Sequence, residues 1–236
     1  MHKDPAGTTS FFDGFWSLVE HSGHCEIVIC PSFLDIQNAV AAARGTRIKI
    51  GAQNLYWADE GAFTGEVSGP MISESGCSHV IVGHSERRRY FGETNESVLK
   101  KTMAALDAGL NPIVCIGERE KKNVEAVLTE QFRRGIGGLS AGQFARIVVA
   151  YEPVWAIGAG ETATPEVAAH ANQLIRAQAK CSFGADAAYN VRILYGGSVK
   201  SDNAKSLQAQ PEIDGFLVGG ASLDPVSFAE IVDLYI

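Results

Sequence analysis

The sequence is short of basic residues and lacks any long apolar run. Its 236 residues carry 20 Lys and Arg against 27 Asp and Glu, a formal net charge of −7. Nucleic-acid binding needs clustered Lys and Arg to displace phosphate counterions, so this balance argues against a nucleic-acid partner. No apolar stretch approaches a membrane span, and the first ten residues lack the basic-then-apolar order of a signal peptide. We therefore expect a cytoplasmic protein without a nucleic-acid or membrane partner.

Paired cysteine motifs are also missing. The five cysteines are scattered without a Cys-x-x-Cys spacing, which predicts reduced thiols and neither a disulfide framework nor a zinc tetrad. His21, His24 and Cys25 offer metal-binding side chains within five residues, but a surface turn is the favoured interpretation. We expect no metal site.

Short β-branched runs alternate with amphipathic stretches along the whole chain. The expected strands are 27–30, 48–52, 80–82, 112–115, 147–151, 191–195 and 216–218. The expected helices are 6–20, 34–44, 70–76, 96–108, 120–137, 165–180, 201–208 and 225–235. Since no linker or low-complexity segment interrupts this pattern, residues 1–236 are predicted to form a single domain.

Strict alternation of strands and helices predicts an α/β protein with a parallel sheet covered on both faces. A doubly wound sheet places its glycine-rich turn after the first strand, whereas the paired glycines here follow the last two strands. Late placement favours a (β/α)8-type barrel, whose phosphate sites follow the seventh and eighth strands. The chain opens on a helix, so we expect this barrel with strand 1 missing: seven parallel strands and eight helices.

Two polar residues directly follow apolar strands, where barrel active sites gather. His84 precedes a helix that Ser85 and Glu86 open, and the dipole of that helix should keep the imidazole neutral and able to polarise a carbonyl. Glu152 ends the strand 147–151 and is the candidate general base. A structural histidine and a salt-bridged glutamate are the alternatives for the two residues.

Small residues and glycines predict a lid and a phosphate site. The segment 156–163 is apolar at its tip and contains two glycines that allow a hinge. The pairs at 196–197 and 219–220 expose backbone N–H groups that can bind a phosphate. Either pair alone is explained equally well by a plain turn, and together they favour a phosphate site.

These segments resemble triosephosphate isomerases over essentially the whole chain. The motifs are Ala-Gln-Asn at 52–54, Gly-Ala-Phe-Thr-Gly-Glu at 61–66, Gly-His-Ser-Glu-Arg at 83–87, Ala-Tyr-Glu-Pro-Val-Trp-Ala-Ile-Gly at 150–158, Tyr-Gly-Gly-Ser-Val at 195–199 and Gly-Gly-Ala-Ser at 219–222. The resemblance implies a TIM barrel that interconverts dihydroxyacetone phosphate and glyceraldehyde 3-phosphate in glycolysis and gluconeogenesis. It also implies a homodimer, formed through the loop around Thr64, and no metal or organic cofactor.

The resemblance also assigns roles to single residues. Glu152 would move a proton between two carbons, His84 would polarise the carbonyl, and Glu86 would support the site from behind. The pairing of a neutral His with a Glu base under a closing loop is a familiar description of this family and is not deduced from these residues. The substrate phosphate would bind the main-chain N–H groups of Gly158, Ser198, Gly219 and Gly220.

The start of the chain departs from the family. Members carry a first strand followed by Asn-Trp-Lys, and here Lys3 follows Met1 on the way into the first helix. Loss of a donor of that kind costs on the order of a hundredfold in rate, so we expect impaired turnover. A start codon assigned too far downstream and a natural truncation both explain the departure. A catalytically silent phosphosugar-binding barrel and a different phosphosugar isomerase remain alternative functions.

Overall fold

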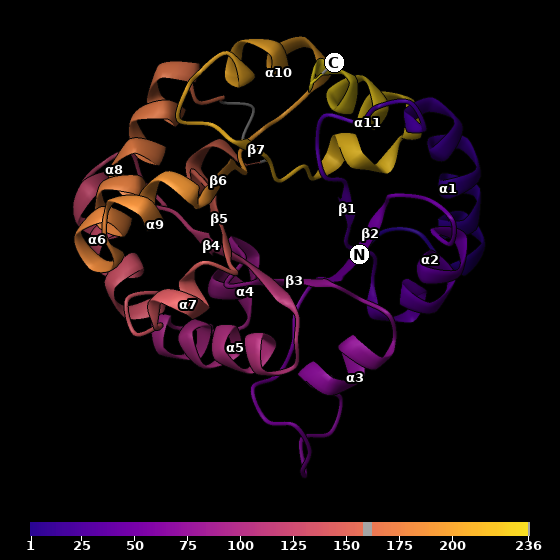
Figure 1. The fold of residues 1–236 in the computed structure, drawn as a ribbon, viewed down its shortest axis with the longest axis horizontal. Coiled ribbons are helices and arrows are strands. Elements are labelled where there is room, and N and C mark those ends of the chain that lie inside the picture. The colour runs from indigo at the N-terminus through magenta and orange to yellow at the C-terminus, as the bar shows by residue number, and fades with distance from the viewer. Residues whose placement is uncertain (158–161, 236) are drawn as a thin grey trace.

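Seven parallel strands form one curled sheet whose spatial order follows the sequence (Figure 1). The computed structural model describes residues 1–157 and 162–235. The strands are β1 (Val28–Ile29), β2 (Lys49–Ala52), β3 (His79–Val82), β4 (Asn111–Ile116), β5 (Val148–Tyr151), β6 (Arg192–Tyr195) and β7 (Gly215–Phe216). Each falls on or within one residue of an expected run.

Alternate side chains of the strands enter two separate apolar clusters. Ile81, Ile113, Cys115, Val148 and Ala150 pack together on the inner face of the curl. Their neighbours along the same strands belong to the larger core between the sheet and the helices. The strands are therefore apolar on both faces, as expected of a parallel sheet covered by helices.

The helices lie outside the curled sheet. They are α1 (Pro5–Val19), α2 (Ile36–Ala42), α3 (Gly69–Glu74), α4 (Ser85–Tyr90), α5 (Asn95–Asp107), α6 (Val124–Gly135), α7 (Ala141–Phe144), α8 (Pro165–Phe183), α9 (Ala185–Asn190), α10 (Ser201–Gln208) and α11 (Pro225–Val232). Four short 3-10 helices are η1 (Phe33–Asp35), η2 (Val154–Ala156), η3 (Gly220–Leu223) and η4 (Asp233–Tyr235).

Local sequence explains where the long helices begin and end. At α8, the Thr164 hydroxyl accepts a hydrogen bond from Val167 N, Pro165 occupies the first turn, and Gly184 with a φ of 94° ends the helix. At α1, the Asp4 carboxylate accepts from Gly7 N at 2.7 Å. Stacked Phe15 and Phe228, with ring centroids 5.1 Å apart, then join α1 to α11.

The expected fold is confirmed in its class and its seven strands. The part of the chain that the structure describes forms eleven α-helices, against the eight segments expected. Of the other three, α4 begins at Ser85, where the sequence predicts that a helix opens, whereas α7 and α9 are short helices within connections. The strands β1 and β7 form the two edges of the sheet, and each contains two residues. In the described ranges no helix is both long and apolar enough to span a bilayer.

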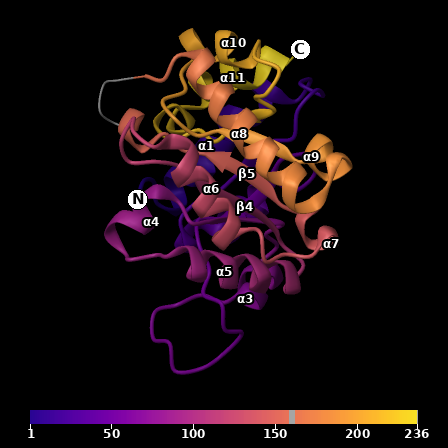
Figure 2. The same ribbon diagram turned by 90° about the vertical axis from the view of Figure 1, so that its left-hand side faces the viewer.

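The connection between β2 and α3 projects away from the rest of the molecule, as both views show (Figures 1 and 2). Three aromatic rings stiffen it: Tyr56 stacks on Trp57 at 4.2 Å and packs against Phe63 at 4.5 Å between centroids. Phe63 keeps 42% of its surface exposed and lies beside Thr64. The loop thus presents a partly apolar tip to the surroundings.

Candidate active site

The two candidate catalytic residues meet at the carboxyl edge of the sheet. His84 follows the end of β3 by two residues, and Glu152 directly follows β5. The His84 Nε2 atom lies 3.0 Å from Glu152 Oε1. The carboxyl ends of parallel strands share one edge of a sheet, which brings together residues 68 positions apart in the sequence.

Ser85 holds the Glu152 carboxylate in a buried position. Ser85 N donates to Glu152 Oε2 at 2.9 Å, and the Ser85 hydroxyl donates to Oε1 at 3.1 Å. Glu152 is only 2% exposed. Burying a carboxylate is costly unless its oxygens accept hydrogen bonds, and the two Ser85 donors supply them. From the sequence, Ser85 was expected only to begin a helix. Its place between His84 and Glu86 in the motif did indicate that it lies near the site.

The surroundings of His84 have opposing effects on the pKa of its imidazole. Burial lowers the pKa of the imidazole, but the hydrogen bond to Glu152 and the charges of Glu152, Glu86 and Glu93 raise it, and the net pKa lies above the ordinary value. Glu86 N donates to His84 Nδ1 at 3.3 Å, as expected at a helix N-terminus. This contact leaves Nε2 to carry the proton that faces Glu152. An Nδ1 atom that accepts a hydrogen bond carries no proton, so the contact with Glu86 N fits the neutral ring that the sequence predicts, whereas the carboxylate of Glu152 favours the protonated form. The neutral ring stays a prediction.

Glu86 lies beside the histidine and faces solvent. Its Oε2 atom is 3.8 Å from His84 Nδ1, and its side chain is 69% exposed. Its neighbours Arg87 and Arg89 are engaged by Glu93 and by the Tyr90 ring, respectively. Of the three consecutive arginines at 87–89, Arg87 is therefore salt-bridged and Arg89 lies over an aromatic ring.

The expected phosphate-binding residues lie after β6 and β7. In the described ranges, the N–H groups of Ser198, Gly219 and Gly220 have no hydrogen-bond acceptor. A Cβ atom at Gly219 or Gly220 would meet nothing within 4 Å, so space is open beside this backbone. Gly158, the fourth expected residue, lies outside the described residues, as does most of the expected lid tip.

Gly196 connects the phosphate region to Glu152. A Cβ atom at Gly196 would lie 3.1 Å from the Glu152 Cγ atom. The first paired-glycine turn therefore packs directly against the side chain of Glu152, the candidate base. A side chain there would press on Glu152, which is a steric reason for glycine in addition to anion binding.

A buried carboxylate anchors the chain just before residue 158. The Trp155 indole N–H donates to Glu118 Oε1 at 2.6 Å, and the Tyr151 hydroxyl donates to the same atom at 2.9 Å. Burial raises the pKa of Glu118, and these two hydrogen bonds oppose the rise. Sequence reasoning did not identify Glu118, since nothing in its local pattern shows that it meets Trp155.

Lys3 is directed toward the helices rather than the catalytic pair. Its Nζ atom lies 5.2 Å from the centre of the Phe11 ring, and its charge helps to lower the pKa of Asp224 at the start of α11. Lys3 therefore lies on the way into α1, where the sequence places it.

Comparison with known proteins gives one consistent result. A family model described as triosephosphate isomerase matches residues 1–235. The chain is 65% identical to a triosephosphate isomerase of Solibacter usitatus over 237 residues, covering 99% of this chain and 95% of the relative. It is 53% identical to those of Citrifermentans bemidjiense, covering 91% of this chain and 87% of the relative, and of Moorella thermoacetica, covering 90% and 86%. The matched motifs, the parallel curled sheet and the His84–Glu152 pair agree with this result, and the chain belongs to the triosephosphate isomerase family of isomerases.

Proposed function

We propose that this chain interconverts dihydroxyacetone phosphate and glyceraldehyde 3-phosphate by proton transfer. The observation that carries the proposal is the 3.0 Å contact between His84 Nε2 and Glu152 Oε1, at the sheet edge that also carries N–H groups without an acceptor among the described residues. A base and a proton donor in one site are the two groups that an aldose–ketose isomerisation needs. The names of the relatives support this substrate pair.

Glu152 takes a proton from the carbon next to the carbonyl and returns one to the adjacent carbon. His84 donates to the carbonyl oxygen and then recovers a proton from the neighbouring oxygen, so that the substrate gains and loses no atoms overall. To reach a substrate carbon, Glu152 must release the two Ser85 hydrogen bonds and the His84 contact. Its departure removes the main influence that raises the His84 pKa and lets the ring act as a neutral electrophile. Glu86 supplies negative charge on the solvent side of the ring.

The substrate phosphate binds the N–H groups of Ser198, Gly219 and Gly220, with Gly158 as a further donor. Backbone donors suit an acidic protein, because they bind an anion without a basic patch. Proton transfer within the substrate requires neither a metal ion nor an organic cofactor. Such a reaction belongs to glycolysis and gluconeogenesis, and the setting we propose is the cytoplasm.

Turnover by a polypeptide of these 236 residues is expected to be low. The resemblance implies an ammonium group ahead of Met1, and Lys3 contacts Phe11 instead of the catalytic pair. Loss of one charged donor at a developing negative charge costs on the order of a hundredfold in rate. The placement of Lys3 also favours a second candidate function, a catalytically silent phosphosugar-binding barrel.

The test is kcat/KM for isomerisation of glyceraldehyde 3-phosphate, with Glu152→Ala purified in the same way to measure contaminating host enzyme. We expect activity that is low but clearly above that of Glu152→Ala. Activity equal to that of the variant would contradict the proposal. Binding of a phosphoglycolate-type analogue would then identify the alternative, because a passive phosphate site binds it equally in parent and Glu152→Gln.

We further propose a homodimer formed through the 53–68 loop. The exposed Phe63 and the adjacent Thr64 give this projecting loop an apolar tip that a second copy can cover. A charge at the tip should oppose association. Light scattering after gel filtration should give a dimer for the parent and for the surface control Ser206→Arg, and a monomer for Thr64→Arg. A monomeric parent, or a dimeric Thr64→Arg, would refute this interface.

A further inference from the structure

The strands β3 and β4 separate just where the catalytic residues begin. Their paired register ends at Val82 and Val114. On the other side of β4 the pairing continues, because Glu152 N donates to Ile116 O at 2.9 Å and Val154 N donates to Glu118 O at 3.0 Å. The end of β4 therefore has strand-like partners toward β5 and none from β3.

Gly83 causes this separation. Its φ of 74° turns the chain away from the sheet, a conformation that side chains rarely allow. A Cβ atom at Gly83 would also lie 2.8 Å from Val98 Cγ2 and 3.1 Å from Arg88 Nη2. The turn that carries His84 consequently leaves backbone groups at the ends of β3 and β4 without strand partners, and such groups need other hydrogen bonds.

Arg88 supplies hydrogen bonds to both strand ends. Its Nε atom donates to Gly83 O at 2.8 Å, and its Nη2 atom donates to Cys115 O at 3.1 Å. Its Nη1 atom donates to Asn95 Oδ1 at 2.8 Å, which fixes the guanidinium against α5. A planar guanidinium with several donors suits such a bridge, and Gly83 directly precedes His84.

Gln131 does the same for Gly117, the residue that follows β4. Its Oε1 atom accepts from Gly117 N at 2.8 Å, and its Nε2 atom donates to Gly117 O at 2.9 Å. Gly117 lies against the catalytic base so closely that a Cβ atom there would be 1.8 Å from Glu152 O. The α6 side chain of Gln131 thus fixes the peptide on which the Glu152 backbone rests.

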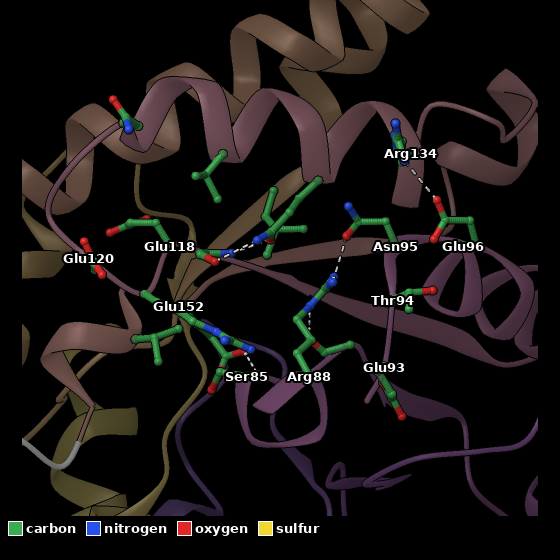
Figure 3. A pocket seen from close by; sticks show the side chains of 18 of the residues that line it. Ser85, Arg88, Glu93, Thr94, Asn95, Glu96, Glu118, Glu120, Arg134 and Glu152 are labelled. Atoms are coloured by element: carbon green, nitrogen blue, oxygen red, sulfur yellow. Dashed lines mark hydrogen bonds and ion pairs between the residues drawn. The ribbon is translucent and has the colours of Figure 1, made fainter. Parts of the chain in front are cut away.

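A cavity adjoins these hydrogen bonds. It has a volume of about 610 Å³, and its lining includes Arg88, Gln131, Ser85 and Glu152. Figure 3 shows Arg88, Ser85 and Glu152 around it. Where a cavity replaces packed side chains, contacts that would fix the wall are lost. Directed hydrogen bonds remain to hold the strand ends.

We propose that Arg88 and Gln131 are positioning residues that hold His84 and Glu152 in their reactive geometry through the backbone of Gly83, Cys115 and Gly117. This inference rests on the proposed isomerase function. Neither side chain contacts His84 or Glu152 through a hydrogen bond among the described residues, so both act through the strand ends. Displacement of a catalytic group by about 1 Å costs on the order of a hundredfold in rate, whereas substrate binding through distant N–H groups is unaffected.

The test compares Arg88→Met and Gln131→Met with matched controls that lose the same kind of bond elsewhere. Arg146 donates to Leu106 O and Leu110 O, and Gln143 accepts from Ser140 N in the cap of α7. Arg146→Met and Gln143→Met therefore measure the effect of losing such contacts away from the site. We expect kcat to fall roughly ten- to a hundredfold in the two site variants, with KM within about twofold, while the controls keep the parent kcat.

Two further measurements keep the outcome decisive. Arg88→Lys retains the charge and can reach one carbonyl, so its kcat should lie between those of the parent and Arg88→Met. If Arg88→Met does not fold, Arg88→Lys takes its place as the site variant. The ¹⁵N signals of the His84 ring should shift in Arg88→Met, Arg88→Lys and Gln131→Met but not in the controls. This readout remains valid if the parent proves inactive, a result that would refute the proposed function alone. Folded site variants with the parent kcat and unchanged ring signals would overturn the inference.

Discussion

At the residue scale, the site depends on one buried carboxylate with several partners. Glu152 faces His84, accepts two hydrogen bonds from Ser85 and packs against Gly196. Each partner acts differently: Ser85 holds the carboxylate by two hydrogen bonds, His84 Nε2 contacts the same carboxylate, and Gly196 leaves the space that a side chain would fill. Removing the charge of Glu152 should therefore be visible first at His84.

We predict that Glu152→Gln lowers the pKa of His84 toward or below its ordinary value of about 6.5. In the parent, burial lowers the pKa of His84, but Glu152, Glu86 and Glu93 together raise it by more than burial lowers it. The variant loses the strongest of these three charges, that of Glu152. A titration of the His84 ring signals by NMR measures both values. An equal or higher pKa in Glu152→Gln would contradict the assignment.

The same shift has a consequence for stability. A group whose pKa is raised by folding contributes stability that is complete below its unfolded pKa and is lost as pH rises through the folded value. The His84 contribution is thus present below about pH 6.5 and disappears above its raised pKa. The difference in free energy of unfolding between parent and Glu152→Gln should be larger at about pH 6 than at about pH 9. A difference that grows with pH would have the wrong sign.

At the element scale, Glu118, which follows β4, binds the end of β5 and η2 through hydrogen bonds from Tyr151 and Trp155. Glu118 is 1% exposed, and its Oε1 atom accepts from both Tyr151 and Trp155. These bonds fix η2, which ends at Ala156 and is followed by Ile157, the last described residue before 158–161. A buried carboxylate that loses a hydrogen-bond donor is left with an uncompensated desolvation cost. Small changes at Trp155 should therefore lower the stability of the fold around η2.

We expect Trp155→Phe to lower the free energy of unfolding by about 1 to 3 kcal/mol, because the indole donor to Glu118 is lost. Trp57→Phe is the control, since Trp57 is partly exposed and its stacking on Tyr56 needs no N–H group. That variant should change stability by less than about 0.5 kcal/mol. Denaturant unfolding measures both, and equal effects would show that the Glu118 hydrogen bond is unimportant.

Sequence patterns predicted the elements better than the contacts between them. The seven strands were predictable because β-branched runs such as 147–151 are buried on both faces. The helix α7 was not, since four residues are too few to show a helical period. The helix α9 was not either, because it begins directly after Gly184, which ends α8. His84 and Glu152 were predictable because each follows an apolar strand.

The supporting residues could not be found in this way. Arg88 and Gln131 act on backbone atoms 27 and 14 positions away, and only the folded chain shows which groups lack a strand partner. The raised pKa of His84 was missed for a similar reason, because it depends on a carboxylate from β5.

At the scale of the whole molecule, the sheet ends in two short edges. The edge strands β1 and β7 are two residues long, and the relatives align over nearly the full chain. Unpaired edges can accept a further strand. The family resemblance places an apolar strand and an Asn-Trp-Lys segment ahead of Met1.

Fusing such a strand, ending in Asn-Trp-Lys, to Met1 should raise kcat/KM for glyceraldehyde 3-phosphate on the order of a hundredfold. A matched fusion ending in Asn-Trp-Met separates the effect of the ammonium group from that of the added strand. We expect the Met fusion to gain thermal stability and little activity. Equal kcat/KM for the two fusions would show that the lysine is not what limits this polypeptide.

The most direct test of the account is transfer of hydrogen at the substrate carbon. We would incubate the parent and Glu152→Gln with glyceraldehyde 3-phosphate in D₂O and follow the product by NMR. A base that holds the proton between removal and return exchanges it with solvent, so the parent should form dihydroxyacetone phosphate carrying deuterium, while Glu152→Gln should form none above the uncatalysed rate. Deuterium incorporation that is equal in the two proteins would contradict the assignment of Glu152 as the base.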